Sequence, residues 1–331
     1  MRKRIIWIDF VKIFACFLVL ILHSIPVDLS ENIYMKGLWI YYIGVFAIPL
    51  FFMTNGYLQL DKSSSYKYII RKISNILVIV FFWNIMMCGV KYLAGKEVEN
   101  PIYESVIGFA QNGYFPHFWF LGSIIIIDVI LPLLQKMYKS KYFNRFVYTS
   151  IGVCISLDII YVIMYRKTGF ILKENIIQTF RMWTWILYFC LGGYVRKNYN
   201  RIDKWINMRM LIFTIFMIFI TVLYECFFAY RLYGCMYCEA FYDSFLVIVT
   251  SFLIFVLFSK LKCSSLIVTK LSNLTMGIYI VHYYILVHVN KVLFVKNCYF
   301  RVINLLVIFF ISTLISYAIS KIPKLNRTIR I

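Results

Sequence analysis

The sequence predicts an all-α fold, a polytopic integral membrane bundle of about ten transmembrane helices with both termini in the cytoplasm. Of its 331 residues, 62% are hydrophobic and only 15% are charged, and the mean hydropathy is +0.79. A soluble domain is about half apolar and about a quarter charged. Apolar runs of about 20 residues recur along the chain, and each can cross a hydrocarbon core of about 30 Å as a helix. A water-soluble fold is therefore excluded.

The apolar runs define the elements in order, at residues 5–25, 38–60, 73–94, 117–138, 146–165, 178–195, 210–230, 241–259, 271–290 and 302–320. The connections are short and eleven residues follow the last run, so we expect a single membrane domain over residues 1–331 without an appended soluble domain. The basic start Arg2–Arg4 resembles a secretory signal. Asp9 and Lys12 interrupt the run, however, and no small-residue cleavage site follows, so we interpret it as a retained helix.

The distribution of basic residues predicts the orientation. With the N-terminus inside, 23 of the 35 Lys and Arg residues lie in cytoplasmic segments, 11 lie in external segments, and Lys12 lies within a span. This bias follows the positive-inside rule and favours a multi-pass protein of the bacterial cytoplasmic membrane. The net charge of +21 is spread over short clusters between spans, where it faces anionic lipid, so we do not expect nucleic-acid binding.

The nine cysteines do not form a metal-ligand pattern. Four of them, Cys16, Cys88, Cys154 and Cys190, lie within spans, where cysteine behaves as a small hydrophobic residue. Cys235 and Cys238 form a CxxC in a predicted external loop, which is either a local disulfide or two unrelated cysteines. We expect no metal site.

Three polar residues in the first span are candidates for chemistry, because charged side chains in a bilayer are costly. Eleven residues separate Lys12 from His23, a rotation of about 1,100°, so the two share a helix face at positions about 16 Å apart along the axis. Asp9, one turn before Lys12, can pair with it. An imidazole can take a proton from a hydroxyl near neutral pH, although a histidine here could also only cap the helix. The shared face favours a polar channel for an anionic or thioester-bearing cosubstrate.

Further motifs accompany this spacing along the chain. They are RIIWIDFVKIFACFLVLILH at Arg4–His23, FFMTNGYL at Phe51–Leu58, Arg71-Lys72-Ile73, HFWFL at His117–Leu121, Tyr188-Phe189 with Gly192-Gly193, and SNLTMGIYIVH at Ser272–His282. Together they resemble the membrane-bound acyltransferase 3 family, over essentially the whole chain. Two positions depart from the family pattern. Lys12 stands where arginine is usual, which loses the bidentate fork, and Asn55 stands where serine is usual.

The resemblance implies transfer of an acyl group, usually acetyl from cytoplasmic acetyl-CoA as cosubstrate, to a hydroxyl of a surface polysaccharide or a lipid-linked sugar precursor. His23 would then be the general base. The other implied site residues are Lys12 and Asp9 beside it, Lys67, Arg71 and Lys72 for the CoA phosphates, and His117, Trp119, Tyr279 and His282 for the substrate. Expected partners are the acyl-CoA donor, the glycan acceptor, membrane lipid and glycan-assembly proteins.

Several of these residues have alternative explanations. Arg71 also fits the ordinary positive-inside signal, and Trp119 fits an interfacial anchor. Tyr279 and His282 could form a structural hydrogen bond. His288, Asp128, Asp158, Glu225 and Asp243 match no motif, and we expect structural pairing or cavity lining for them.

Two other function classes are compatible with a membrane bundle. Intramembrane charges also occur in a transporter or flippase of a lipid-linked glycan, but paired, interrupted half-repeats are not visible. A non-catalytic sensor or assembly subunit leaves the shared face of Lys12 and His23 unexplained.

Overall fold

The computed structural model describes residues 4–24, 38–234, 236–263, 265–293 and 298–329, and within these ranges it consists of helices and the loops that join them. The predicted all-α fold is confirmed. Arg2, Lys3 and Cys235, which belong to the signal-like start and to the CxxC, lie outside the described residues.

Seven helical segments in the described part are long and apolar enough to cross a membrane. They are α1 (Ile6–Ser24), α2–η2–α3 (Leu38–Ile43, Gly44–Phe46, Ala47–Gln59), α4 (Tyr66–Leu93), η3–α6 (Pro116–Phe118, Trp119–Lys139), α7 (Phe143–Thr168), α11 (Met208–Tyr233) and α15 (Cys298–Lys321). Two other predicted spans correspond to shorter apolar helices, α12 (Phe245–Phe258) and α14 (Thr275–Leu293), and the third corresponds to α9 (Met182–Lys197), which has 16 residues. The count of ten crossings and the sidedness of the termini stay predictions.

Short elements connect these helices. They are α5 (Pro101–Gly108), α8 (Leu172–Asn175), η4 (Gln178–Phe180), α10 (Tyr199–Ile202), η5 (Asp203–Trp205), η6 (Cys238–Phe241), α13 (Leu266–Ser272) and η7 (Leu325–Ile329).

Helix α4 begins earlier than the predicted span 73–94. Ser65 caps it by accepting a hydrogen bond from the backbone N–H of Tyr68 at 3.3 Å, which satisfies a donor that would otherwise have no partner in the first turn. The helix therefore starts at Tyr66. Lys67, Arg71 and Lys72, which precede the predicted span, lie in the first two turns of α4.

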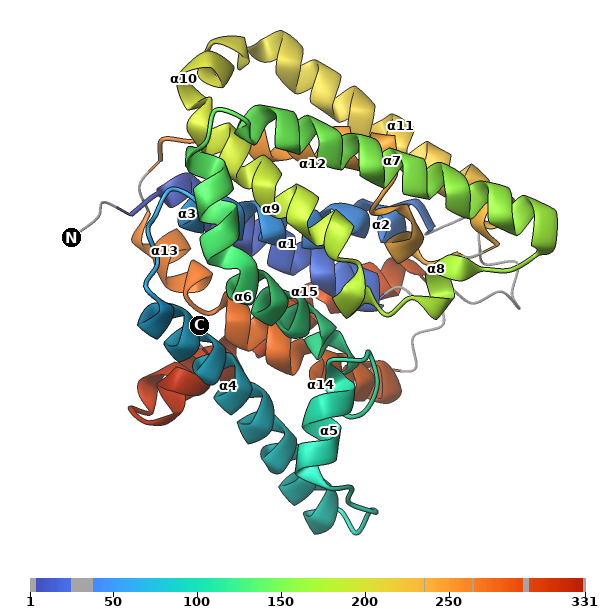
Figure 1. The fold of residues 1–331 in the computed structure, drawn as a ribbon. Helices are drawn as coiled ribbons and strands as arrows, with labels where there is room; N and C mark the ends of the chain where they lie inside the picture. Colours follow the sequence, from blue (N-terminus) through green and yellow to red (C-terminus); the bar gives the residue numbers. More distant parts are fainter. Residues whose placement is uncertain (1–3, 25–37, 235, 264, 294–297, 330–331) are drawn as a thin grey trace.

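Helix α1 lies at the centre of the bundle, where it packs against α3, α12, α13, α14 and α15 (Figure 1). Its buried side chains include Trp7, Val11, Ala15 and Leu18. At the periphery, fewer than a third of the residues in the spans of α4, α7 and α11 are buried. Since a hydrocarbon core accommodates apolar side chains, lipid covers these outer faces.

Helices α3 and α9 cross in direct backbone contact. A Cβ atom added at Gly56 would lie 1.7 Å from the backbone oxygen of Phe189, and one at Gly192 would lie 1.9 Å from that of Met53. Only glycine allows so close an approach. The FFMTNGYL motif and the motif with Gly192-Gly193 are therefore the two sides of one helix crossing.

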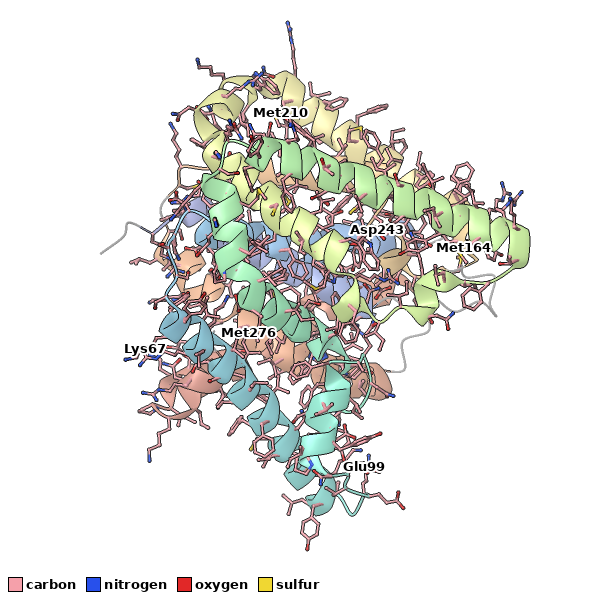
Figure 2. All side chains as sticks on the ribbon, viewed as in Figure 1. Lys67, Glu99, Met164, Met210, Asp243 and Met276 are labelled. Carbon is pink, nitrogen blue, oxygen red and sulfur yellow. The ribbon has the colours of Figure 1, made fainter. Side chains whose placement is uncertain are left out.

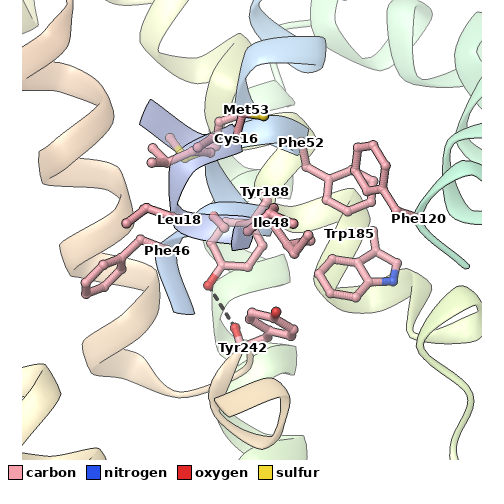
Figure 3. Close-up of a cluster of buried hydrophobic side chains, with 14 of the residues drawn as sticks. Cys16, Leu18, Phe46, Ile48, Phe52, Met53, Phe120, Trp185, Tyr188 and Tyr242 are labelled. Carbon is pink, nitrogen blue, oxygen red and sulfur yellow. Dashed lines mark hydrogen bonds between the residues drawn. The ribbon is translucent and has the colours of Figure 1, made fainter. Parts of the chain in front are cut away.

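Aromatic side chains fill the space beside this crossing. Phe52 stacks on Trp185 with ring centroids 4.8 Å apart, and Tyr188 donates a hydrogen bond to the backbone oxygen of Tyr242 at 2.8 Å (Figure 3). All four side chains are less than 2% exposed. This packing fixes α3, whose other side faces the cavity described next.

Candidate active site

Three of the four histidines come together although they are distant in the sequence. His23 lies near the end of α1, His117 lies in η3 and His282 lies in α14. The ring centroid of His282 is 5.2 Å from that of His23 and 5.3 Å from that of His117, and the His23 and His117 centroids are 6.4 Å apart. We call these three residues the histidine cluster. No three His, Cys, Asp or Glu side chains of the described residues are arranged to hold a metal ion.

Hydrogen bonding fixes the tautomer of His282. Its Nδ1 lies 2.6 Å from the backbone oxygen of Tyr279, and because a carbonyl oxygen only accepts, Nδ1 carries the proton. Its Nε2 then has a free lone pair and, within the described ranges, no hydrogen-bond partner. Both ring nitrogens of His117 are likewise buried and without a partner there. The cluster therefore offers nitrogens that can accept a proton from a hydroxyl.

A cavity of about 400 Å³ lies between α1, α3, α4, α6 and α14. Its size is within the range of about 300–1,000 Å³ that is usual for small-molecule sites. Lys12, Lys62 and Lys72 contribute basic groups, and no carboxylate is among its lining residues. Thr54 also lines it, and the hydroxyl of Thr54 is buried without a hydrogen-bond partner among the described residues. The cavity is thus suited to a ligand that carries negative charge. We call it the lysine cavity.

Tyr279 lies between the lysine cavity and the histidine cluster. It lines the cavity, and its ring centroid is 5.0 Å from that of His117 and 6.1 Å from that of His282. Its hydroxyl donates a hydrogen bond to the backbone oxygen of His117. Lys12 shares the cavity with residues of α14, and His23 contacts His282 of the same helix. Both side chains thus lie on the side of α1 that faces α14, as their spacing predicts.

A chain of polar contacts runs along the wall of the lysine cavity. Lys72 Nζ lies 2.8 Å from Asp128 Oδ1 and donates to Gln59 Oε1 at 3.1 Å. Gln59 donates in turn to Asn55 Oδ1 at 3.2 Å. The Asp128 side chain is only 1% exposed and that of Lys72 is 12% exposed, so this ion pair is largely desolvated. Asn55, at the position of the family serine, is therefore part of the cavity wall.

Breaking the Lys72–Asp128 pair is expected to destabilise the protein by about 3–5 kcal/mol, because the remaining charge would be buried without a partner. Lys72→Met and Asp128→Leu should each lower the apparent Tm of the purified protein in detergent. The double variant should recover most of the loss, since it buries no charge. Lys136→Met, which removes an exposed lysine of α6, is the control. A double variant less stable than both single variants would contradict this explanation.

Asp9 does not form the expected pair with Lys12. Its carboxylate accepts hydrogen bonds from Arg4 at 2.6 and 3.0 Å and from Ser272 Oγ at 2.8 Å. The reason is tertiary: Asp9 faces the junction of α13 and α14, where Arg4 also bonds Asn273 at 2.9 Å, whereas Lys12 lines the cavity. Lys12 has no ion-pair partner among the described residues. Its ammonium group is therefore available to an anionic ligand.

The remaining predicted site residues lie near the cavity and cluster but do not all join them. Lys67 and Arg71 are exposed on α4 and do not line the lysine cavity; Lys67 is marked in Figure 2. Trp119 packs against Trp185 with ring centroids 5.3 Å apart and is 7% exposed. Trp119 thus belongs to the aromatic packing around α9. Its role in substrate binding stays a prediction.

A second cavity, of about 540 Å³, lies beside α8, η4 and η6, toward the opposite end of the bundle from the start of α1 (Figure 1). Lys173 pairs there with Asp158 at 2.6 Å, and Arg181 donates to the backbone oxygen of Glu239 at 2.9 Å. Burial lowers the pKa of Lys173, an effect that Asp158 opposes, and burial raises the pKa of Glu239. Lys173 lies between two predicted spans and Arg181 at the edge of the span 178–195, and hydropathy alone does not indicate their burial, which arises from folding of the loop.

The chain also matches a known family. A family model described as an acyltransferase domain matches residues 5–321, nearly the whole chain. The chain belongs to the acyltransferase 3 family. The resemblance carried by the motifs is thereby confirmed. A search of curated proteins and a search of solved structures each gave no match.

The motifs that resemble those of the acyltransferase 3 family come together in the folded chain. Helix α1 carries Lys12 and His23, η3 carries His117, and α14 carries Tyr279 and His282. These three elements converge on the lysine cavity and the histidine cluster. The glycine motifs form the α3–α9 crossing that holds one cavity wall. The protein is a multi-pass membrane acyltransferase.

Proposed function

We propose that this acyltransferase moves an acetyl group from cytoplasmic acetyl-CoA to a hydroxyl of a surface polysaccharide or a lipid-linked sugar precursor, in a bacterial cytoplasmic membrane. The observation that carries the proposal is the histidine cluster beside a lysine-lined cavity. A proton acceptor next to a site for an anionic donor is what O-acyl transfer from a CoA thioester requires.

In this proposal the lysine cavity receives the donor. The phosphates of CoA carry several negative charges, and Lys12 and Lys62 supply cations within the cavity, whereas the charge of Lys72 is already paired with Asp128. Lys67 and Arg71 on the exposed face of α4 would bind phosphate groups that remain outside. The thioester would then approach Tyr279 and the histidines.

The chemistry needs one proton transfer and one acyl transfer. A ring nitrogen of the cluster, which we assign to His23, removes the proton of the acceptor hydroxyl as its oxygen attacks the thioester carbonyl. The C–O ester bond forms, the C–S bond breaks, and the CoA thiolate takes the proton from the imidazolium. The ring is then neutral again, and no other reactant is consumed.

The test in cells is to delete the gene, purify the surface glycan and quantify its base-labile acetyl esters. Wild-type complementation should restore the esters, as should His288→Ala, because His288 is exposed and outside the cluster. His23→Ala should not restore them. Equal ester content in the deletion and wild-type strains would refute the proposal, and changed glycan export with unchanged esters would favour a flippase.

Lys12→Met is expected to raise the KM for acetyl-CoA about 10- to 100-fold, since a hydrogen bond to a charged group contributes about 1.5–3 kcal/mol. Lys12→Arg, which keeps the charge and matches the usual family residue, should stay close to the wild type. The measurement is initial rate against acetyl-CoA concentration with the purified enzyme, and Lys136→Met serves as the control. An unchanged KM in Lys12→Met would exclude contact between this ammonium and the donor.

A further inference from the structure

A third cavity lies among the ends of α7, α9, α11 and α12, apart from the lysine cavity and the histidine cluster. Its volume is about 500 Å³, and its lining includes Tyr148, Arg201, Arg209, Phe213, Phe252 and Leu253. These helix ends belong to the side of the bundle where basic residues concentrate, which the positive-inside rule assigns to the cytoplasm. None of these residues has a part in the acyl-transfer reaction proposed above.

The cavity has a polar mouth and an apolar floor. Arg209 is in the first turn of α11, and Phe213 is one turn deeper. Phe252 and Leu253 lie more than one turn inside the end of α12 at Phe258. Arg201 stands at the mouth on α10, close to the start of α11 where Met210 is marked in Figure 2. Polarity therefore changes from the helix ends toward the interior of the helices, as it does from the headgroup to the acyl chains of a phospholipid.

The charges at the mouth are not neutralised within the described part of the protein. Neither Arg201 nor Arg209 has an ion-pair partner there, and no carboxylate lines the cavity. Basic residues nearby differ in this respect, because Arg196 pairs with Asp61 at 2.7 Å and Lys260 pairs with Asp203 at 3.1 Å. Both guanidinium groups line the cavity without an ion pair among the described residues, and that of Arg201 lies over the Trp205 ring at 5.8 Å from its centroid. Guanidinium binds phosphate with two parallel hydrogen bonds.

We propose that this cavity binds an anionic phospholipid of the same leaflet, with its phosphate at Arg201 and Arg209 and an acyl chain over Phe213, Phe252 and Leu253. A soluble phosphate would leave the apolar floor uncovered. A zwitterionic lipid carries no net charge to match the two arginines. Anionic lipid matches both parts of the cavity.

The test is thermal unfolding of the purified full-length protein in detergent, titrated with phosphatidylglycerol or with phosphatidylcholine. Phosphatidylglycerol is expected to raise the apparent Tm of the wild type more than phosphatidylcholine does. In Arg201→Gln/Arg209→Gln, half-maximal stabilisation should require about 25-fold more phosphatidylglycerol, since each arginine near the surface contributes about fivefold. Both side chains are exposed, so the variant is expected to fold.

Lys136→Gln/Lys324→Gln removes the same number of exposed charges elsewhere and should respond as the wild type does. An equal response of the arginine variant and the wild type would overturn the proposal, as would equal effects of the two lipids on the wild type. Inorganic phosphate or CoA is added in separate titrations. If either one reproduces the stabilisation and loses it in the arginine variant, the site takes a soluble phosphate and the lipid assignment is overturned.

Discussion

Replacing His23 with alanine is expected to lower the turnover number of acyl transfer by about 10²- to 10⁴-fold, the usual contribution of a positioned general base. The KM for acetyl-CoA should change little, because the ring acts on the acceptor and not on the donor phosphates. His282→Ala is expected to cause a loss of similar size, since its free Nε2 belongs to a ring 5.2 Å from that of His23. The measurement is steady-state kinetics with purified protein.

His288→Ala is the matched control, because it removes the one histidine that lies outside the cluster. The apparent Tm of each variant separates loss of chemistry from loss of fold. If His23→Ala keeps more than about a tenth of the wild-type turnover, this imidazole is not the general base. A rise in KM alone would instead assign His23 to substrate binding.

Gly192→Ala and Gly56→Ala are each expected to destabilise the protein by about 3 kcal/mol or more, at the upper end of overpacking costs. The added methyl group would meet a backbone oxygen, which no side-chain rotation can move away. Helices α3 and α9 would have to separate, and both the aromatic packing and the cavity wall would be disturbed. The measurement is the apparent Tm, together with the yield of monodisperse protein in detergent.

Gly152→Ala and Gly89→Ala are the controls, because a Cβ atom at either position has no neighbour within 4 Å. Both lie within helices, so alanine should be neutral or stabilising by up to about 1 kcal/mol. Loss of stability in all four variants would show that stability depends on helical glycines in general and not on the close contact at the α3–α9 crossing. Tolerance of Gly192→Ala would show that the crossing is looser than described.

Much of the fold could be predicted because membrane burial depends on local composition. Apolar runs located α1, α4, α6, α7, α11 and α15, and no tertiary information was needed for that. Boundaries were less predictable where polar residues enter a helix. The start of α4 depends on the cap at Ser65, and hydropathy does not detect the two polar turns that follow it.

The candidate site could be predicted in part. The spacing of Lys12 and His23 fixes their common direction along one helix, and the motifs indicated His117 and His282. Pairings between helices could not be obtained from spacing. Asp9 bonds Arg4 and Ser272, and Lys72 bonds Asp128, because α13 and α6 approach α1 and α4 only in the folded bundle.

The glycine crossing also determines how the lysine cavity can change shape. Helix α3 is held rigidly against α9, so the wall formed by Asn55 and Gln59 cannot give way when a bulkier group enters. The facing wall, with Tyr68 and Lys72, belongs to α4, whose outer surface borders fluid lipid instead of protein. Of these two walls, α4 is the one that can move outward without displacing a helix packed behind it.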